Sequence, residues 1–185
     1  MNAALQALLS SHSPADDKER ADLEAMRSWA ASLPSPFSRE QLPGHFTGSA
    51  VVVTPDGAQV CLVLHAKLHR WLQPGGHADV ADGGSMETTA LREAREETAL
   101  DVVLHPTAPR PLDVDVHAIP ARKTEPEHRH LDVRYLVVAK NPEALAHDPN
   151  ESHGAQWLSW EEALARADEA PLRRMLEKAM RTVLL

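Results

Sequence analysis

The pattern of apolar and polar residues along the chain begins with helical spacing. Ala, Leu, Glu and Arg dominate residues 1–32, and apolar side chains recur every three to four positions at Leu23, Met26, Trp29 and Ala30. This spacing predicts a helix with one apolar face, and Ser13-Pro14-Ala15-Asp16 predicts a break before it. The apolar face is expected to pack against the rest of the chain or against a second copy in a homodimer.

The period then changes to that of strands. Prolines in Leu33-Pro34-Ser35-Pro36 end the helical region and open a linker up to Pro43-Gly44. Two apolar runs, 49–53 and 60–64, flank Thr54-Pro55-Asp56-Gly57, whose residues predict a hairpin turn. Further strands are predicted over 101–104, 112–117, 130–139 and 156–158.

Helices are predicted between and after these strands. One runs from about Ser85, a plausible N-cap, to Thr98, another begins after Ser159, and a last one covers residues 171–183. Mixed strands around a central helix predict an α+β fold of the α/β/α-sandwich type. We expect an N-terminal helical extension over residues 1–42 and one domain over residues 43–185.

Composition narrows the function classes. The chain has 185 residues, 43% of them hydrophobic, and a net charge of −8. An acidic protein is not expected to bind a nucleic-acid backbone, and no apolar stretch approaches the length of a membrane span. The start of the chain lacks the basic residues of a signal peptide, so a cytoplasmic location is expected. The single cysteine, Cys61, lies in an apolar run and is expected to be a buried thiol.

Residues 75–100 combine a glycine turn with an acidic helix. Glu96 and Glu97 follow Glu93 by three and four positions, so all three carboxylates are predicted on one side of the helix. Like charges this close repel each other, and a hard cation such as Mg²⁺ or Mn²⁺ would neutralise them. Just upstream, Pro74-Gly75-Gly76 gives a backbone turn able to approach a ligand closely. The segment predicts a divalent-metal site for handling phosphates.

The same residues resemble the signature of the Nudix (MutT-like) hydrolases, which ends in Arg-Glu-aliphatic-x-Glu-Glu-x-Gly-aliphatic. Residues 92–100, Arg-Glu-Ala-Arg-Glu-Glu-Thr-Ala-Leu, match this half except at Ala99, where the family has glycine in a position that favours a left-handed backbone. The interval from Gly76 to Arg92 is two residues longer than the family pattern. We expect the extra residues in the loop 79–84.

The lengthened loop leaves one family residue open. The early glutamate of the signature falls on Gly84, or its role passes to Asp79 or Asp82. The departure concerns the fit of the substrate, because the glutamates and the arginine of the helix are all present.

The resemblance implies a Nudix-like mixed sheet and a metal-dependent pyrophosphohydrolase. Such an enzyme cleaves a diphosphate linkage, in a nucleotide or a nucleoside-diphosphate-linked metabolite, by attack of water on phosphorus, with Mg²⁺ or Mn²⁺ as cofactor. It would hold the metal through the Gly75 carbonyl and the carboxylates of Glu93, Glu96 and Glu97. Glu96 or Glu97 would also orient the attacking water.

Two further catalytic residues follow from the resemblance. Arg92, four residues before Glu96, is expected to orient a glutamate through an ion pair. Many members take another glutamate, as base or extra ligand, from a loop before the last strand. Glu151, six positions before Trp157, fits that place, and the alternative is an exposed loop carboxylate.

Histidines form a second group of candidates. His128, His130 and Asp132 alternate, so in a strand all three face one side. His77 follows the glycine pair, and His117 ends the run 112–117. Three roles are open for these histidines. They could be hydrogen-bonded residues of a polar sheet face, or they could bind a transition ion such as Zn²⁺. In the third role, His77, His128 and His130 would contact phosphate or sugar oxygens of a substrate.

Two alternatives to a hydrolase remain. A non-catalytic Nudix-fold module would bind or sense a ligand, but it has little use for so costly a cluster of carboxylates. An isoprenoid-diphosphate isomerase, which shares the fold, would need a cysteine placed for proton transfer, and Cys61 lies in an apolar run. Five cations could contact phosphates, although such residues are usually surface charges: Lys67, Arg70, Arg122, Lys123 and Arg134.

Overall fold

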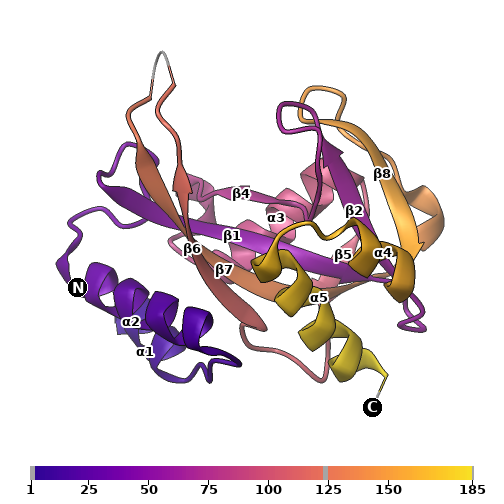
Figure 1. Cartoon of the computed structure of the whole chain (residues 1–185), viewed down its shortest axis with the longest axis horizontal. Coiled ribbons are helices and arrows are strands. Elements are labelled where there is room, and N and C mark those ends of the chain that lie inside the picture. The colour runs from indigo at the N-terminus through magenta and orange to yellow at the C-terminus, as the bar shows by residue number, and fades with distance from the viewer. Residues whose placement is uncertain (1–2, 123–124, 185) are drawn as a thin grey trace.

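A mixed sheet with helices on both faces forms the body of the protein, seen in a computed structural model that describes residues 3–122 and 125–184 (Figure 1). The strands are β1 (Gly44–Val53), β2 (Gln59–His65), β3 (Trp71–Leu72), β4 (Gly75–His77), β5 (Val102–Leu104), β6 (Asp113–Ile119), β7 (His128–Ala139) and β8 (Ser152–Ser159). The α-helices are α1 (Ala3–Ser10), α2 (Asp17–Ser32), α3 (Met86–Thr98), α4 (Trp160–Arg166) and α5 (Ala170–Val183), with short 3₁₀ turns η1 (Val80–Asp82) and η2 (Pro142–Ala144). The predicted α+β class with N-terminal helices is confirmed.

Strands β1 and β7 form the centre of the sheet. They pair in parallel along the whole of β1, from Gly44 opposite Arg129 to Val53 opposite Val138. Each then divides its other edge between two partners. β1 pairs with β4 in its first half and with β2 at its end, whereas β7 pairs first with β6 and then with β5. Because of this division, the short strands β4 and β5 and the turns beside them lie next to the two central strands.

Local sequence signals account for several element boundaries. The predicted hairpin turn after Val53 joins the antiparallel strands β1 and β2. Ser85 caps α3, since its hydroxyl accepts the N–H of Thr88, and Ala99 ends that helix in the left-handed conformation, with φ of 57°. β1, β7 and β8 begin earlier than the apolar runs predicted, because their first residues include polar ones that face one side of a sheet.

The two faces of the sheet carry different helices. Figure 1 shows α3 behind the sheet and α5 in front of it. α3 approaches β1 closely at Gly48, where a Cβ would come within 2.7 Å of the Met86 carbonyl oxygen. Helices α1 and α2 lie to one side, next to β6 (Figure 1). No helix within the described ranges is long and apolar enough to cross a membrane.

The apolar face of α2 packs against the sheet. Leu23, Met26 and Ala30 are buried in the same apolar cluster as Phe46 of β1 and Leu131 of β7. Of the two predicted roles for this face, packing within the chain is confirmed. A homodimer stays a prediction, and so does the division of the chain between residues 42 and 43.

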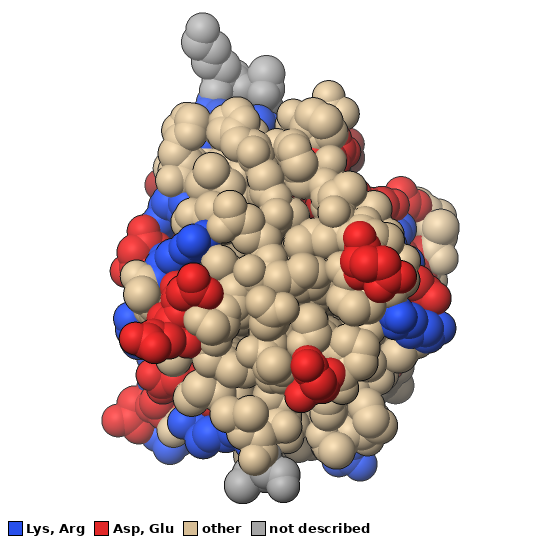
Figure 2. Space-filling view, turned by 90° about the vertical axis from the view of Figure 1, so that its right-hand side faces the viewer, with Lys and Arg blue, Asp and Glu red and all other residues tan. Residues whose placement is uncertain are grey.

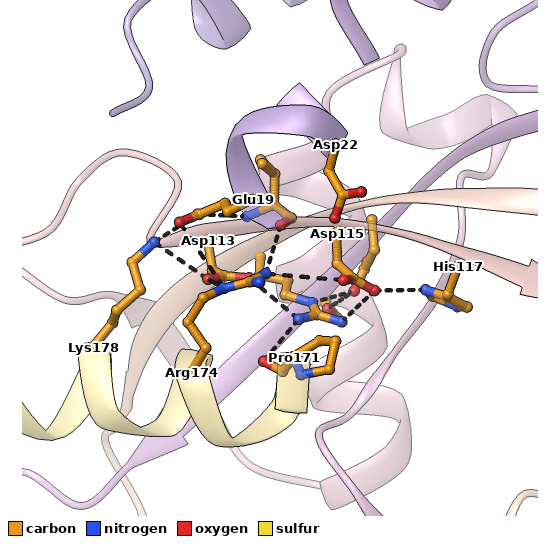
Figure 3. Close-up of polar contacts among 12 residues, drawn as sticks. Glu19, Asp22, Asp113, Asp115, His117, Pro171, Arg174 and Lys178 are labelled. Atoms are coloured by element: carbon orange, nitrogen blue, oxygen red, sulfur yellow. Dashed lines mark hydrogen bonds and ion pairs between the residues drawn. The ribbon is translucent and has the colours of Figure 1, made fainter. Parts of the chain in front are cut away.

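Arg134 corrects one expectation from the sequence. Its side chain, predicted as a phosphate contact or a surface charge, is 4% exposed and donates hydrogen bonds to Asp132 (2.8 Å), Asp113 (3.2 Å) and Asp115 (3.2 Å). Arg174 of α5 joins this network by donating to Asp113 (Figure 3). Arg134 follows Asp132 by two positions in β7, so it lies on the same buried face.

The other predicted cations have ordinary surroundings where they are described. Arg70 pairs with Asp168 and Glu169, and Lys67 and Arg122 are exposed. Lys123 lies outside the described residues.

Candidate functional site

Three carboxylates from two parts of the chain converge beside the glycine turn. Glu93 and Glu97 lie one turn apart on the inner side of α3 and are only 9% and 7% exposed. Glu151 comes from the turn before β8 and is exposed. One oxygen of each carboxylate lies within 4.8 Å of the others, which is a spacing that a shared cation could bridge.

The glycine turn fits closely against these acids. The N–H of Gly75 donates to Glu97 Oε1 (2.6 Å). A Cβ on Gly76 would come within 2.6 Å of Glu93 Cδ. A side chain at position 76 would therefore displace the Glu93 carboxylate from the backbone of β4.

Arg92 connects the helix, the loop and the turn. Its Nη1 donates to Glu93 Oε1 (2.9 Å) and to Glu96 Oε2 (2.8 Å), and its Nη2 donates to the His77 carbonyl oxygen (2.7 Å). The predicted ion pair with a glutamate is present. Its donors are fully engaged in the protein, so Arg92 positions the carboxylates instead of reaching outward.

Asp82 is the loop residue that contacts Arg92. It accepts from Arg92 Nε (3.1 Å) and Nη2 (3.0 Å), from Thr89 Oγ1 (2.9 Å) and from the N–H of Asp79 (2.8 Å). Of the three positions that the lengthened loop left open, Gly84 and Asp79 make no such contact with the arginine in this structure. The loop 79–84, where the extra residues are expected, contains the turn η1, which ends at Asp82 beside Thr89 and Arg92 of α3.

Glu96 takes a different direction from Glu93 and Glu97. The three were predicted on one side of the helix, but the Glu96 side chain is 57% exposed and is held by Arg92. It does not join the three converging carboxylates. A residue three positions on is rotated from Glu93 in the opposite sense to one four positions on, which separates Glu96 from Glu97.

Burial makes negative charge costly at this site. It raises the pKa of Glu97 to about 8, against the lowering effect of the Gly75 N–H, and Glu151 and Glu93 raise it further. Burial also raises the pKa of Glu93 to about 6, although Arg92 opposes the change. A bound divalent cation would remove this penalty, so the donors are of the type and charge that Mg²⁺ or Mn²⁺ prefers.

Five histidines gather on the face of the sheet that also carries Arg134. His45 of β1 stands opposite His130 of β7, which stands opposite His117 of β6. The ring centroid of His45 lies 5.1 Å from that of His128 and 5.0 Å from those of His130 and His77. The predicted group of His77, His128 and His130 is therefore close in space, with His45 at its centre.

Comparison with known families decides the classification. The sequence model of the NUDIX domain family matches residues 44–179. This chain belongs to the Nudix family. The matched residues include the glycine turn, the three carboxylates and all five clustered histidines of this Nudix protein.

Solved structures agree in fold. A C. elegans Ap4A hydrolase in a binary complex is 21% identical, with a TM-score of 0.56 over 72% of this chain and 93% of that one. A Nudix-family hydrolase from Clostridium perfringens is 26% identical, with a TM-score of 0.53 over 75% and 95%. The Nudix domain of Shewanella oneidensis NrtR, complexed with ADP ribose, is 22% identical, with a TM-score of 0.53 over 83% and 96%. Comparison with curated protein sequences gave no match.

His45 was not among the residues singled out in the sequence of this Nudix protein. It lies near the end of the predicted linker, and no apolar run surrounds it. Its parallel partner His130 is far away in the sequence, so the pairing could not be predicted from spacing. The alternation of His45 with Thr47 and Ser49 was the one available signal.

Cys61 is buried as expected. Burial raises the pKa of its thiol to about 12, and the nearby charge of Glu97 acts in the same direction. A buried thiol with so high a pKa is a poor proton donor, so Cys61 does not support the isomerase alternative.

Proposed function

We propose that this Nudix protein is a divalent-metal-dependent pyrophosphohydrolase. Its substrate class is a nucleotide or a nucleoside-diphosphate-linked metabolite, in which it cleaves a diphosphate linkage by attack of water on phosphorus. The observation that supports this most strongly is the convergence of Glu93, Glu97 and Glu151 beside Gly75 and Gly76. Family membership supports the reaction class.

The carboxylates are proposed as metal ligands. Glu93 and Glu97 from α3 and the carbonyl of Gly75 would hold Mg²⁺ or Mn²⁺, with Glu96 able to join if it leaves Arg92. When bound, the ion neutralises the diphosphate charge and makes a coordinated water easier to deprotonate. Arg92 keeps Glu93 and the His77 carbonyl in fixed positions, through the hydrogen bonds described above.

Glu151 is proposed as the residue that handles the proton of the attacking water. Its carboxylate is exposed and lies with the buried pair, so it can pass a proton to solvent. A role as an additional ligand is the alternative. A Glu151→Gln variant separates the two, because loss of a base changes the pH profile of kcat, whereas loss of a ligand raises the metal concentration needed for half-maximal activity.

A small molecule suits the charge of the protein better than a nucleic acid does. The net charge is −8, and the side of the molecule in Figure 2 is mostly uncharged, with acidic side chains standing among neutral ones. Phosphate-backbone binding would need a continuous basic surface. A cytoplasmic location stays part of the prediction.

The test is a substrate panel with defined metal. Ap4A and ADP-ribose, named with the related structures, should be included with nucleoside triphosphates and nucleotide sugars. We expect release of phosphate, pyrophosphate or a nucleotide with Mg²⁺ or Mn²⁺ but not with a chelator. In ¹⁸O-labelled water, one label should enter a phosphate product.

Matched variants make the result specific. Glu97→Gln should abolish cleavage, while Glu161→Gln, an exposed glutamate of α4, should leave it unchanged. Cleavage by Glu97→Gln at the wild-type rate would contradict the proposal. Binding of a panel member without any cleavage would favour the non-catalytic module instead.

A further inference from the structure

The centre of the histidine cluster is a buried imidazole whose nitrogens make no well-formed hydrogen bond with any described residue. His45 is 1% exposed, and neither of its ring nitrogens has a well-formed hydrogen bond. Burying an imidazole in this state is costly, and most buried polar side chains avoid it by hydrogen bonding. A bound ligand that accepts or shares the lone pair of a His45 nitrogen would remove this cost.

Two neighbouring rings present nitrogens to the same space. One nitrogen each of His45, His128 and His130 lies within 4.8 Å of the others. The Nε2 atoms of His128 and His130 are 3.3 Å apart. Two nitrogens bound to one tetrahedral zinc ion, at about 2.0–2.1 Å each, would be about 3.3–3.4 Å apart.

The tautomer of His128 is set by its surroundings. His128 Nδ1 lies 2.9 Å from the carbonyl oxygen of Pro126, which can only accept a hydrogen bond, so Nδ1 carries the proton. Nε2 is then left with its lone pair directed at His130. Histidines that bind metal usually donate their other N–H to a carbonyl or carboxylate in this way.

The chemistry of the rings favours a cation over an anion. To bind phosphate several of them would have to be protonated together, and buried rings whose centroids lie 4.9–5.1 Å apart disfavour several positive charges. Neutral imidazoles offer lone pairs, and nitrogen donors suit zinc and similar divalent ions better than Mg²⁺.

We propose that His45, His128 and His130 bind a transition-metal ion of the zinc type, at a site separate from the carboxylates. The ion would join the beginning of β1 to the beginning of β7, two strands that are paired there. His77 lies next to it, with its ring centroid 5.0 Å from His45 and 4.9 Å from His130.

The test uses cobalt(II) as the probe, on the full chain stripped of metal by a chelator. Excess Mg²⁺ is present throughout, so that the carboxylate site is occupied by the ion it prefers. We expect one equivalent of Co²⁺ to give the strong visible absorption of a four-coordinate ion with nitrogen ligands. Zn²⁺ should then abolish that absorption by displacement.

Variants assign the site. His128→Gln and His130→Gln should weaken Co²⁺ binding by more than the roughly 10–100-fold that follows loss of an outer-shell partner. His105→Gln, outside the cluster, and Glu97→Gln should leave it unchanged. Absence of the absorption band in the wild type, its survival in both histidine variants, or its loss in Glu97→Gln would overturn the proposal.

A measurement on the wild type guards against variants that fail to fold. Histidine ring signals in the NMR spectrum should shift on addition of one equivalent of Zn²⁺, for His45, His128 and His130 at least. If these signals stay in place, or if only histidines outside the cluster respond, the site does not exist.

Discussion

Among the described carboxylates, Glu97 is the one whose pKa its surroundings raise furthest. It is buried beside β4, and the carboxylates of Glu93, Glu151 and Asp148 raise its pKa further. Within the described part of the chain, the hydrogen bond that favours its charged form comes from the Gly75 N–H. These surroundings favour the protonated, neutral form of Glu97 when no cation is bound, and a bound cation would favour the carboxylate.

This environment makes the stability of the metal-free protein depend on pH. The pKa of Glu97 is raised to about 8 in the folded protein, from 4.5. The folded state then binds more protons than the unfolded state, so stability is full below the unfolded pKa and is lost as the pH rises towards 8. In a chelator, the free energy of unfolding should fall by up to about 1.4 kcal/mol per pH unit across this window.

Chemical denaturation at a series of pH values measures the effect. Glu97→Gln should flatten the curve, leaving the smaller contribution of Glu93, whose pKa is raised to about 6. Saturating Mg²⁺ should flatten it in the wild type as well. Equal slopes for wild type and Glu97→Gln in chelator would show that Glu97 titrates normally.

Gly76 gives a second prediction at this scale. A methyl group there would lie within 2.6 Å of Glu93 Cδ, so Gly76→Ala should displace Glu93. We expect at least a tenfold rise in the Mg²⁺ concentration needed for half-maximal activity, since outer-shell changes cost roughly 10–100-fold in metal affinity. The measurement is a metal titration of the turnover rate.

The control is another glycine of the same domain. Gly154 has open space around its Cα, so Gly154→Ala should behave like the wild type. An unchanged metal dependence in Gly76→Ala would mean that the turn can yield.

At the scale of single residues, the sequence predicted which residues form the site better than it predicted where their side chains point. Glu93, Glu97 and Glu151 were all selected, and the structure brings them together. Arg134 was misjudged because a charge on an isolated strand is normally solvated, whereas here three aspartates surround it. The alternation that placed His128, His130 and Asp132 on one face already contained Arg134 as its next member.

At the scale of elements, helix α2 covers an edge of the sheet. Among the described strands β6 pairs with β7 alone, so backbone N–H groups on its other side would lack a strand partner. Glu19 accepts the N–H of Val114 (3.2 Å), and Asp22 accepts that of Val116 (3.1 Å). Carboxylates of a helix thus take the place of a neighbouring strand.

Glu19 carries most of this contact. It is fully buried and also pairs with Lys178 of α5 (2.7 Å; Figure 3). It pairs with His12 as well (2.8 Å). Glu19→Ala should lower the free energy of unfolding by about 1–3 kcal/mol, because it leaves the buried N–H of Val114 without its acceptor and leaves Lys178 with Asp113 alone. Urea denaturation measures the loss.

Glu24 provides the comparison within the same helix. It is exposed, so Glu24→Ala should change stability by no more than about 0.5 kcal/mol. Similar losses for the two variants would mean that the effect comes from helix propensity and not from the buried contacts.

Elements with local signals were the ones that could be predicted. The turn after Val53, the Ser85 cap and the left-handed Ala99 each depend on a few adjacent residues. β3 and β4 have no such signal, because strands of two or three residues take their shape from the partners beside them. The early part of β1 depends in the same way on β7.

At the scale of the whole molecule, the N-terminal helices and the sheet share one core. Leu5, Leu9 and Leu23 are buried in the same cluster as Val114 and Leu131. A chain of residues 43–185 alone would expose this surface, the edge of β6 and the partners of Glu19. We expect it to associate into larger species and to lose its cooperative unfolding transition.

Size-exclusion chromatography with light scattering, compared with the full chain, tests this expectation. It also tests the predicted division between residues 42 and 43. If the fragment associates, residues 1–42 and 43–185 form a single folding unit. A monomeric fragment with the melting temperature of the full chain would show that the extension is dispensable.

The parallel pairing of β1 with β7 has a consequence for the order of events during folding. It joins residues as much as 85 positions apart, such as Thr47 and Asp132, and α3 lies inside the loop that this pairing closes. Long loops close slowly, and helices form early. We therefore expect α3 to form before the sheet encloses it, at a stage when Glu93 and Glu97 are still in water, so that their metal affinity arises only in the last steps of folding.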